Sequence, residues 1–342
     1  MVPAGRPRAD AEHDRAGGRQ LIDETFEQEA ERYRHELRVH CYRLLGSYDD
    51  AEDLVQETYL RAWRGRAGFE GRSSLRTWLY RIATNACLDD VRRPARVLPY
   101  QLEPESFPAE ALPARHDLPW LQPFPDLLLD RAEEPDAQVI RRETIELAFL
   151  TAIQQLPPRQ RAVLIFRDVL GWSAKETAEV LDLTVAAANS ALQRARPVLR
   201  AHLPARRTEW SAEPSAAEEK LVAKYMAAFE AGDAAGLAAL MHEDVRVTMP
   251  PYPFWYSGRD KAEQVFAANF EPGGPANRGR WRFEAARVNR QPAVAAYLEG
   301  GRGFEPFAVV VFRIEQGLVA EMTAFENVDF ARFGLPGYLA SA

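Results

Sequence analysis

The chain has 342 residues, enough for two or three compact domains. Its hydrophobic content of 46% and charged content of 27% are typical of a soluble globular protein, and no stretch approaches the roughly 20 apolar residues of a membrane span. The net charge of −7 argues against a uniformly basic nucleic-acid binder, so any phosphate contact must come from local patches. Cys41 and Cys87 fall in apolar helical surroundings, which predicts free thiols in a reducing cytosol, and we expect a cytoplasmic protein.

A polar segment precedes the first predicted helix. Residues 1–20 contain no apolar stretch of the kind found in a signal peptide, so we expect a disordered tail. Apolar residues at three- and four-residue spacing then predict a helix over 21–46 that ends at Gly46. Ser47 can cap the next helix, DDAEDLVQETYLRAW. One face of that helix carries Asp53, Gln56, Glu57 and Leu60. A charged helix face is usually only solvated, and the acidic start and basic end of this one also complement the helix dipole.

The segment 69–93, FEGRSSLRTWLYRIATNACLDDVRR, has the most unusual pattern in the chain. It predicts a short polar loop and then a helix that Ser73 or Ser74 caps and Pro94 ends. Apolar residues at helical spacing make one stripe for burial. The opposite face carries Trp78, Arg81, Asn85, Asp89 and Arg92. An indole can stack on an unpaired base, an amide can bond a base edge and guanidiniums can neutralise phosphates. The alternative is that Trp78 is half-buried packing and the arginines are a solvated face.

Residues 95–137 differ in character, because prolines recur and no period persists. Between residues 97 and 140 nine carboxylates face two arginines, a local charge of −7. This composition predicts an acidic linker that is extended and mobile when alone. Its apolar residues are too many for a pure spacer and suggest a docking segment. They are Trp120, Leu121, Phe124 and Leu127 to Leu129.

Residues 138–203 are predicted to be helical again. Pro157 and Pro158 separate a first helix from a second one. The stretch GWSAKETAEVLDLTVAAANSALQRARPVLR then predicts two capped helices joined by a tight turn, which is helix-turn-helix geometry. From Arg159 to Arg207 there are nine basic and four acidic residues, a local charge of +5 inside an acidic chain. This reversal favours contact with phosphates.

A polar linker over 204–217 precedes a third predicted domain, 218–342, of α+β type. Two helices, the aromatic loop PPYPFWYSG and a third helix are followed by the alternating strands WRFEAARV, AVAAYLEG, FAVVVFRI and LVAEMTAF. Turns are predicted at Gln316-Gly317 and over Asn289 to Pro292. We expect a curved antiparallel sheet in a cone with an interior cavity.

Residues 24–203 resemble an extracytoplasmic-function (ECF) sigma factor, the promoter-recognition subunit of bacterial RNA polymerase. The resemblance rests on DDAEDLVQETYLRAW, FEGRSSLRTWLYRIATNACLDDVRR and the helix-turn-helix, which occur in the family's order. It implies two all-α domains, sigma domain 2 over 21–94 and sigma domain 4 over 138–203. It also implies binding to core RNA polymerase and to promoter DNA, both as duplex and as melted non-template strand.

The resemblance assigns a role to each block. Polymerase contact falls to Asp53, Gln56, Glu57 and Leu60. Melting and holding of the minus-ten element fall to Arg72, Ser73, Ser74, Trp78, Arg81, Asn85, Arg92 and Arg93. The minus-thirty-five element falls to Ala187, Asn189, Ser190, Gln193, Arg194 and Arg196. Asn189 and Ala191 stand where the family commonly has a basic pair, which implies a weaker or unusual readout. The acidic linker would imitate nucleic acid and thread the positively lined channels of the polymerase.

Residues 218–342 resemble a SnoaL-like domain, and the PFWYSG and LQPFPDLLLD stretches resemble SigG-type ECF sigma factors. The expected fold class is multidomain, with two all-α sigma domains and an α+β SnoaL-like cone. This fold hosts isomerases, cyclases and pure binding modules, so it fixes no chemistry. A pocket or an interface is expected at Tyr252, Phe254, Trp255, Tyr256 and Trp281.

The leading interpretation is a non-enzymatic sigma factor that its last domain regulates in cis, through contact with the sigma domains or through an unknown small ligand. An alternative makes the last domain a ligand-binding or isomerase- or cyclase-like module. Its acid–base candidates are His242, Asp260, Glu305, Glu321 and Glu326. A third alternative is a repressor or activator that uses only the helix-turn-helix. The sequence has no Gly-rich phosphate loop, metal-spaced Cys/His cluster or nucleophile elbow, so we expect no metal and no cofactor.

Overall fold

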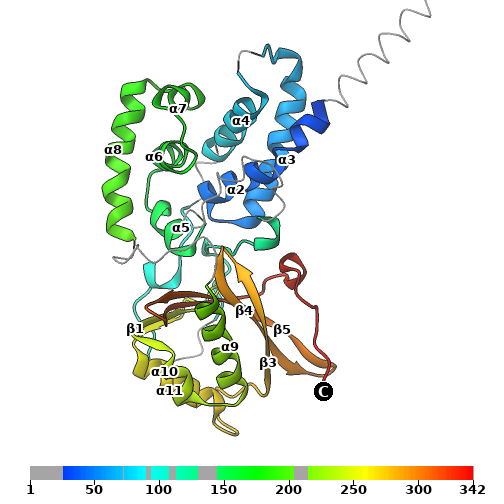
Figure 1. Ribbon diagram of the computed structural model, residues 1–342, viewed down its shortest axis with the longest axis vertical. Coiled ribbons are helices and arrows are strands. Elements are labelled where there is room, and N and C mark those ends of the chain that lie inside the picture. Colours follow the sequence, from blue (N-terminus) through cyan, green and yellow to red (C-terminus); the bar gives the residue numbers. More distant parts are fainter. Residues whose placement is uncertain are drawn as a thin grey trace, which may run out of the picture.

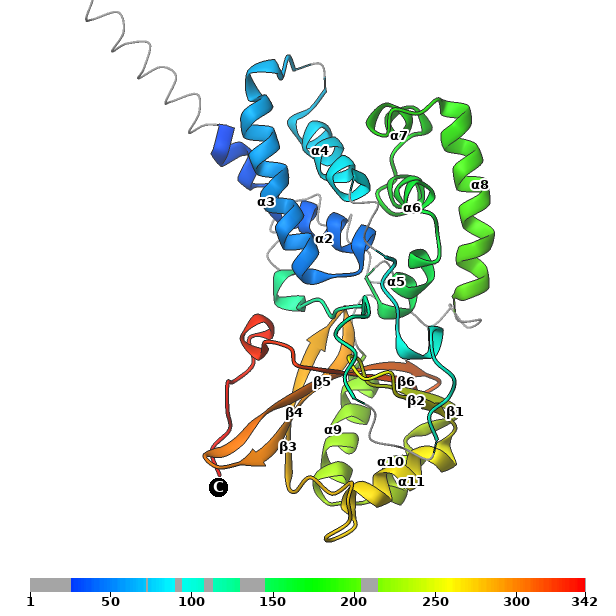
Figure 2. The same ribbon diagram turned by 180° about the vertical axis from the view of Figure 1, so that it is seen from behind.

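The computed structural model has a helical half and a sheet half that lie against one another (Figures 1 and 2). It describes residues 26–71, 73–89, 94–107, 113–129, 145–203 and 215–341. The helical half ends near residue 203, and the sheet half begins at residue 215. This order confirms the predicted fold class of all-α domains followed by an α+β domain. The predicted tail 1–20 and most of the predicted linker 204–217 lie outside the described residues.

Three helices form the first bundle of the helical half. They are α2 (Arg34–Leu45), α3 (Tyr48–Gly65) and α4 (Leu75–Asp89). Gly46 ends α2 in the left-handed conformation, with φ of 69°. Ser47 caps α3 by accepting a hydrogen bond from the backbone N–H of Asp50. Ser74 accepts one from the N–H of Thr77 at the start of α4, 3.1 Å away. These contacts confirm the predicted capping of both helices.

The predicted helix over 21–46 is wrong in one respect. A turn at residues 32–33 separates α2 from an earlier helical turn. The turn lets Phe26 reach back to the other helices, where its ring centroid lies 6.3 Å from those of Trp63 and Trp78. We attribute the break to this aromatic packing, which a pattern of spacings along one helix does not reveal.

Four helices form the second part of the helical half. They are α5 (Leu147–Gln154), α6 (Pro158–Leu164), α7 (Ala174–Val180) and α8 (Val185–His202). A π-helical turn, Ile165–Val169, continues α6. Ser173 and Glu176 form a reciprocal capping box at α7, and Thr184 caps α8. Asp182 takes φ of 50° in the turn between them. The predicted helix-turn-helix is therefore present.

The described part of the linker, 95–107 and 113–129, packs against both halves of the molecule. Trp120, Leu121 and Phe124 are buried, as expected of a docking segment. Two short 3₁₀ turns, Pro99–Gln101 and Asp126–Leu128, interrupt it. These residues are not a pure spacer, because their apolar side chains find partners in the folded chain.

The sheet contains six strands in the order β2-β1-β6-β5-β4-β3. They are β1 (Met241–Thr248), β2 (Trp255–Ser257), β3 (Trp281–Val288), β4 (Gln291–Gly300), β5 (Gly303–Glu315) and β6 (Leu318–Glu326). The pairs are antiparallel except for β1 and β6, which run parallel. The sheet is therefore mixed, and the expected antiparallel sheet is wrong at this pair. Two parallel neighbouring strands need a long connection, and the connection from β1 to β6 contains most of the domain.

Two tight turns set the register of the hairpins. Gln316 and Gly317 have φ of 51° and 74°, which confirms the predicted turn between β5 and β6. Asn289 and Arg290 have φ of 57° and 56° between β3 and β4. Since β4 already begins at Gln291, the turn predicted to reach Pro292 is two residues too long.

Alternate residues of the central strands face two different cores. On one face Val294, Val310 and Phe312 pack under helices α9 (Ala216–Glu230), α10 (Ala234–Ala239) and α11 (Arg259–Phe270). On the other face Ala295 and Val309 belong to a core that continues through the linker into the helical half. The helical half and the sheet half therefore share one hydrophobic core.

Candidate nucleic-acid interface

Helix α4 presents its predicted polar face at the edge of the bundle. Trp78 and Asn85 are half-buried, and Arg81 is exposed. The Trp78 ring packs beside Phe69 of the preceding loop, with 4.9 Å between centroids, and beside Phe26 at 6.3 Å. The indole is thus oriented by two other aromatic rings while part of it stays accessible. Among the other candidates of this block, Ser73 and Ser74 are exposed, whereas Arg72, Arg92 and Arg93 lie outside the described residues.

The exposed guanidinium of Arg81 meets the helix-turn-helix. It donates a hydrogen bond of 2.6 Å to Asp182, which lies in the turn between α7 and α8. The two side chains come from parts of the chain that are 101 residues apart. The guanidinium of Arg81 is therefore paired with a carboxylate from the other helical part.

An aromatic cluster lies behind this ion pair and joins the two helical parts. His40 and Tyr80 of the first part contact Phe166 and Trp172 of the second, with ring centroids 5.2 to 6.2 Å apart between the two parts. The Nε2 atom of His40 lies 2.8 Å from the hydroxyl of Thr84. Burial lowers the pKa of His40 to about 3, and the nearby arginines add to the shift. The imidazole is therefore neutral inside this cluster at physiological pH.

The predicted polymerase-facing side of α3 is open to solvent. Asp53, Gln56 and Leu60 are exposed, and Glu57 pairs with Arg61 at 2.8 Å. Leu60 is 51% exposed, which makes it one of the few large apolar side chains on the described surface.

All six predicted reading residues of α8 lie on its exposed face. They are Ala187, Asn189, Ser190, Gln193, Arg194 and Arg196. Ala191, which stands among them in the sequence, is buried against the rest of the helix-turn-helix. Arg196 forms a bidentate pair with Asp168, at 2.8 and 2.9 Å. Sequence reasoning missed Val185, an apolar residue at the start of α8 that is 45% exposed.

The five aromatic residues singled out in the third domain do not form one pocket. Phe254 and Tyr256 are buried in the core under the helices. Trp255 instead donates a hydrogen bond of 2.8 Å to the carbonyl of Glu103 in the linker. Tyr252 is half-buried, and Trp281 packs near the opposite end of the sheet against Phe229 and Phe307. The ring of Trp255 also lies 6.4 Å from that of Tyr100 in the linker, so Trp255 fits the expected interface.

The acid–base candidates are also scattered. His242 lies in β1 and accepts a hydrogen bond from the N–H of Asp244. Asp260 and Glu305 are exposed. Glu321 is taken up in ion pairs with two arginines. Glu326 is half-buried, and burial raises its pKa above the usual value. The interior that a substrate would need is filled by apolar side chains.

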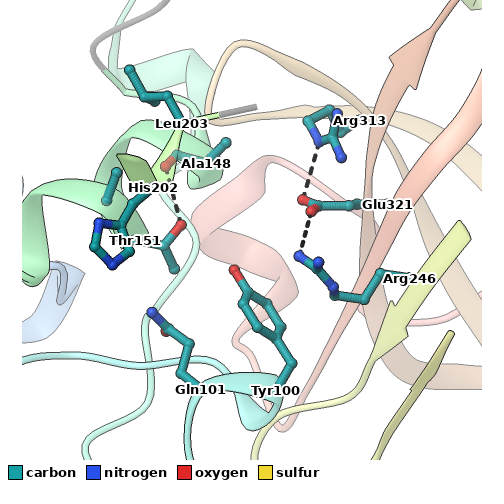
Figure 3. A pocket seen from close by; sticks show the side chains of 10 residues that line it. Tyr100, Gln101, Ala148, Thr151, His202, Leu203, Arg246, Arg313 and Glu321 are labelled. Atoms are coloured by element: carbon teal, nitrogen blue, oxygen red, sulfur yellow. Dashed lines mark hydrogen bonds and ion pairs between the residues drawn. The ribbon is translucent and has the colours of Figure 1, made fainter. Parts of the chain in front are cut away.

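A cavity of about 320 Å³ lies where the linker, the helical half and the sheet meet (Figure 3). Arg246 and Arg313 both pair with Glu321, at 2.8 and 3.1 Å. Arg246 also lies over the ring of Tyr100, 4.3 Å from its centroid. The opposite wall comprises Gln101, Ala148, Thr151, Ala152, His202 and Leu203. Arg313 also pairs with Glu315, so two carboxylates balance the two arginines beside this cavity.

The described residues contain no group of three or more His, Cys, Asp or Glu side chains arranged to hold a metal ion. Among the helices of those same residues, none is both long and apolar enough to cross a membrane.

Three family models match the chain in sequence order. The model for Sigma-70 region 2 matches residues 30–97, the model for Sigma-70, region 4 matches 146–197, and the model for the SnoaL-like domain matches 222–322. These segments correspond to the first bundle, the helix-turn-helix part and the sheet domain.

Two relatives from Mycobacterium tuberculosis (strain H37Rv) span nearly the whole chain. The ECF RNA polymerase sigma factor SigG is 42% identical over 328 residues, which cover 94% of this chain and 88% of SigG. The ECF RNA polymerase sigma factor SigJ is 29% identical over 310 residues, which cover 88% of this chain and 91% of SigJ. The crystal structure of M. tuberculosis SigJ has a TM-score of 0.56 at 24% identity and covers 91% of this chain and 99% of that chain, so the two share a fold.

Proposed function

Because the chain belongs to the extracytoplasmic-function family of RNA polymerase sigma factors, we propose that it binds core RNA polymerase and opens promoter DNA. The observation that carries the proposal is the outer face of α4, where Trp78, Arg81 and Asn85 lie outside the bundle core. The indole and the amide hold the separated non-template strand, and the guanidinium neutralises its phosphates. By the family's sequence pattern, the same role extends to Arg72, Ser73, Ser74, Arg92 and Arg93.

The two flanking surfaces complete the proposed complex. The exposed side of α3 docks on the polymerase, with Leu60 as its apolar centre and Asp53, Gln56 and Glu57 around it. The exposed side of α8 enters the major groove of the minus-thirty-five element. Arg194 and Arg196 supply positive charge there, whereas Asn189 and Gln193 supply amides for base edges.

The third domain acts in cis in this proposal, because it contacts the linker between the two DNA-binding parts. Glu105 of the linker accepts hydrogen bonds from Lys261 at 2.5 Å and from the N–H of Ser257 at 2.8 Å. These contacts lower the pKa of Glu105. Arg115 of the linker donates its N–H to the carbonyl of Pro251. A linker held in this way is withheld from the polymerase, so the third domain restrains the factor.

A non-enzymatic factor fits the third domain better than an isomerase- or cyclase-like enzyme. The specific observation is the apolar filling of the space between α9, α10, α11 and the sheet, where Tyr225, Phe266 and Phe312 meet. The acid–base candidates lie outside this filling, and an enzyme of this fold class would need an open concave site beside them.

Run-off transcription tests the proposed function. The full chain and core RNA polymerase are combined on a promoter fragment that the complex itself selects from random DNA. We expect a promoter-dependent transcript that Asn85→Ala lowers on the order of tenfold, since stacking and base contacts are worth roughly 1–3 kcal/mol each. Asn277→Ala is the matched control, because Asn277 bonds only within a loop of the third domain. A wild-type chain that yields no more transcript than core polymerase alone would overturn the proposal.

A further inference from the structure

The turn between β3 and β4 lies where both helical parts and the linker meet. Its Asn289 is completely buried. The side-chain carbonyl of Asn289 accepts a hydrogen bond of 2.8 Å from the N–H of Phe124 in the linker. Its amide donates to the hydroxyl of Tyr42 on α2 at 2.8 Å and to the carbonyl of Ile145, just before α5, at 2.7 Å. One side chain thus joins three segments that are far apart in the sequence.

The two residues after Asn289 extend the same contact. The N–H of Arg290 donates to the carboxylate of Asp126 in the linker at 2.8 Å. The side-chain carbonyl of Gln291 accepts from the N–H of Leu147 at 2.9 Å. Leu147 is the first residue of α5, whose N–H has no partner within the helix, so the turn completes that helix start. The turn therefore forms hydrogen bonds with both helical parts and with the linker.

The backbone of the turn explains why asparagine stands at this position. Its φ of 57° is in the left-handed region, which asparagine tolerates better than most residues do. A glycine there would keep the backbone conformation and remove only the amide. The substitution Asn289→Gly thus separates the hydrogen bonds of the side chain from the shape of the turn.

The arrangement that this turn stabilises brings α7 against the DNA-facing side of α4. Helix α4 lies against α7, and Arg81 is paired with Asp182. The rings of Tyr80 and Trp172 meet at 5.4 Å behind the pair. We call this the closed arrangement. A strand of DNA that contacts Arg81 would have to break its pair with Asp182 first.

We propose that the β3–β4 turn is a latch, in which Asn289 bonds the two helical parts and the linker into the closed arrangement. The inference rests on the proposed function for its biological meaning, since the face that meets α7 is the proposed DNA surface. The hydrogen bonds of Asn289 form in the closed arrangement, and they are lost once the helical parts separate. By linkage, loosening it raises the fraction of open molecules and lowers the polymerase concentration needed for binding.

The distance between the two helical parts tests the latch directly. Spin labels are placed on the full chain at Arg64 of α3 and Lys175 of α7, both of which are exposed, while the native Cys41 and Cys87 are buried. Double electron–electron resonance then gives the distance distribution. We expect one short distance in the wild-type chain and a second, longer population in Asn289→Gly.

Two further variants sharpen the result. Asn289→Asp keeps the acceptor for Phe124 and loses the donors to Tyr42 and Ile145, so it should also populate the longer distance. Asn277→Ala removes hydrogen bonds of an asparagine elsewhere in the third domain and should leave the distribution unchanged. Circular dichroism checks that each variant stays folded. Distributions of folded Asn289→Gly and Asn289→Asp that match the wild type would overturn the latch.

A measurement of polymerase binding tests the latch and the proposed function independently of each other. If the latch and the proposed function both hold, Asn289→Gly lowers the half-saturating concentration of core RNA polymerase on the order of tenfold, because two donated bonds and one accepted bond of a buried group are lost. A longer distance without any polymerase binding by the wild-type chain would support the latch and contradict the sigma-factor function. An unchanged distance in Asn289→Gly, together with normal transcription by the wild-type chain, would contradict the latch and support the sigma-factor function.

Discussion

At the scale of single residues, the pair Arg81–Asp182 connects a proposed DNA contact to the closed arrangement. Both side chains are largely exposed, at 47% and 66%, so the pair adds less than about 1 kcal/mol to stability. We predict that Asp182→Asn leaves the melting temperature nearly unchanged and tightens binding of a single-stranded minus-ten oligonucleotide several-fold, because Arg81 is released. Fluorescence anisotropy measures the affinity. Glu179→Gln is the control, since Glu179 pairs only with the exposed Lys175, and equal affinities for all three chains would contradict the prediction.

His40 makes a second prediction at this scale, on pH. Its pKa is lowered to about 3 in the folded chain from an ordinary value near 6.5, mainly by burial. The unfolded chain therefore binds a proton that the folded chain does not bind, and stability falls as the pH drops from 6.5 towards 3. The contribution of this one group is at most about 1.4 kcal/mol per pH unit. Urea unfolding at several pH values should show a flatter dependence in His40→Gln than in the wild type, and identical slopes would contradict it.

The residues that sequence reasoning found and those that it missed differ in the range of their contacts. Ser47 and Ser74 cap helices through bonds to residues three positions ahead, so local spacing is enough to predict them. Asn289 was predicted only as part of a turn, because its partners lie 144 to 247 residues away. Such a bond depends on how whole domains meet, and no local pattern signals it.

At the scale of elements, α7 depends on its cap because it has only seven residues. Ser173 and Glu176 satisfy each other's backbone N–H groups at its start. We predict that Ser173→Ala lowers the free energy of unfolding by about 1 kcal/mol and weakens binding to minus-thirty-five duplex, since α7 positions α8. Lys175→Ala in the same helix should change neither by a comparable amount. Thermal unfolding and gel-shift titration measure the two effects, and a Ser173→Ala chain as stable as the wild type would contradict the prediction.

Most elements could be predicted from periodicity, and the exceptions have a common cause. The bounds of β3 agree with the predicted strand WRFEAARV residue for residue. The break before α2 and the parallel pairing of β1 with β6 did not follow from the sequence patterns. The first depends on Phe26 packing against two other helices, and the second on which strand closes the sheet. Both are set by tertiary contacts that override local preference.

At the scale of the whole molecule, one hydrophobic core runs from the first helix bundle through the linker to one face of the sheet. Leu37, Phe124 and Val309 are all members of it. We predict that the full chain unfolds in one cooperative transition, with tryptophan fluorescence and circular dichroism changing at the same urea concentration. Asn289→Gly should separate the two curves, because it loosens the junction. Two well-separated transitions in the wild-type chain would contradict the shared core.

The role of the acidic linker segment is also clear only when the whole molecule is considered. The sequence placed an acidic segment between two DNA-binding parts, which suggested a mobile linker. In the structure Glu105 and Asp126 of that segment bond to the third domain, so the acidic charge is partly used within the molecule. The sequence could predict the sign of this charge but not its partner.

Strand opening on promoter DNA tests the central claim most directly, namely that the outer face of α4 holds the melted strand. Permanganate reacts with unpaired thymines, so it reports the opened minus-ten element in complexes of the full chain with core RNA polymerase. The account predicts that Asn85→Ala and Trp78→Ala reduce this reactivity at least tenfold at a concentration where each variant still binds the polymerase, while Asn277→Ala does not change it. Reactivity equal to the wild type in both α4 variants would contradict the account.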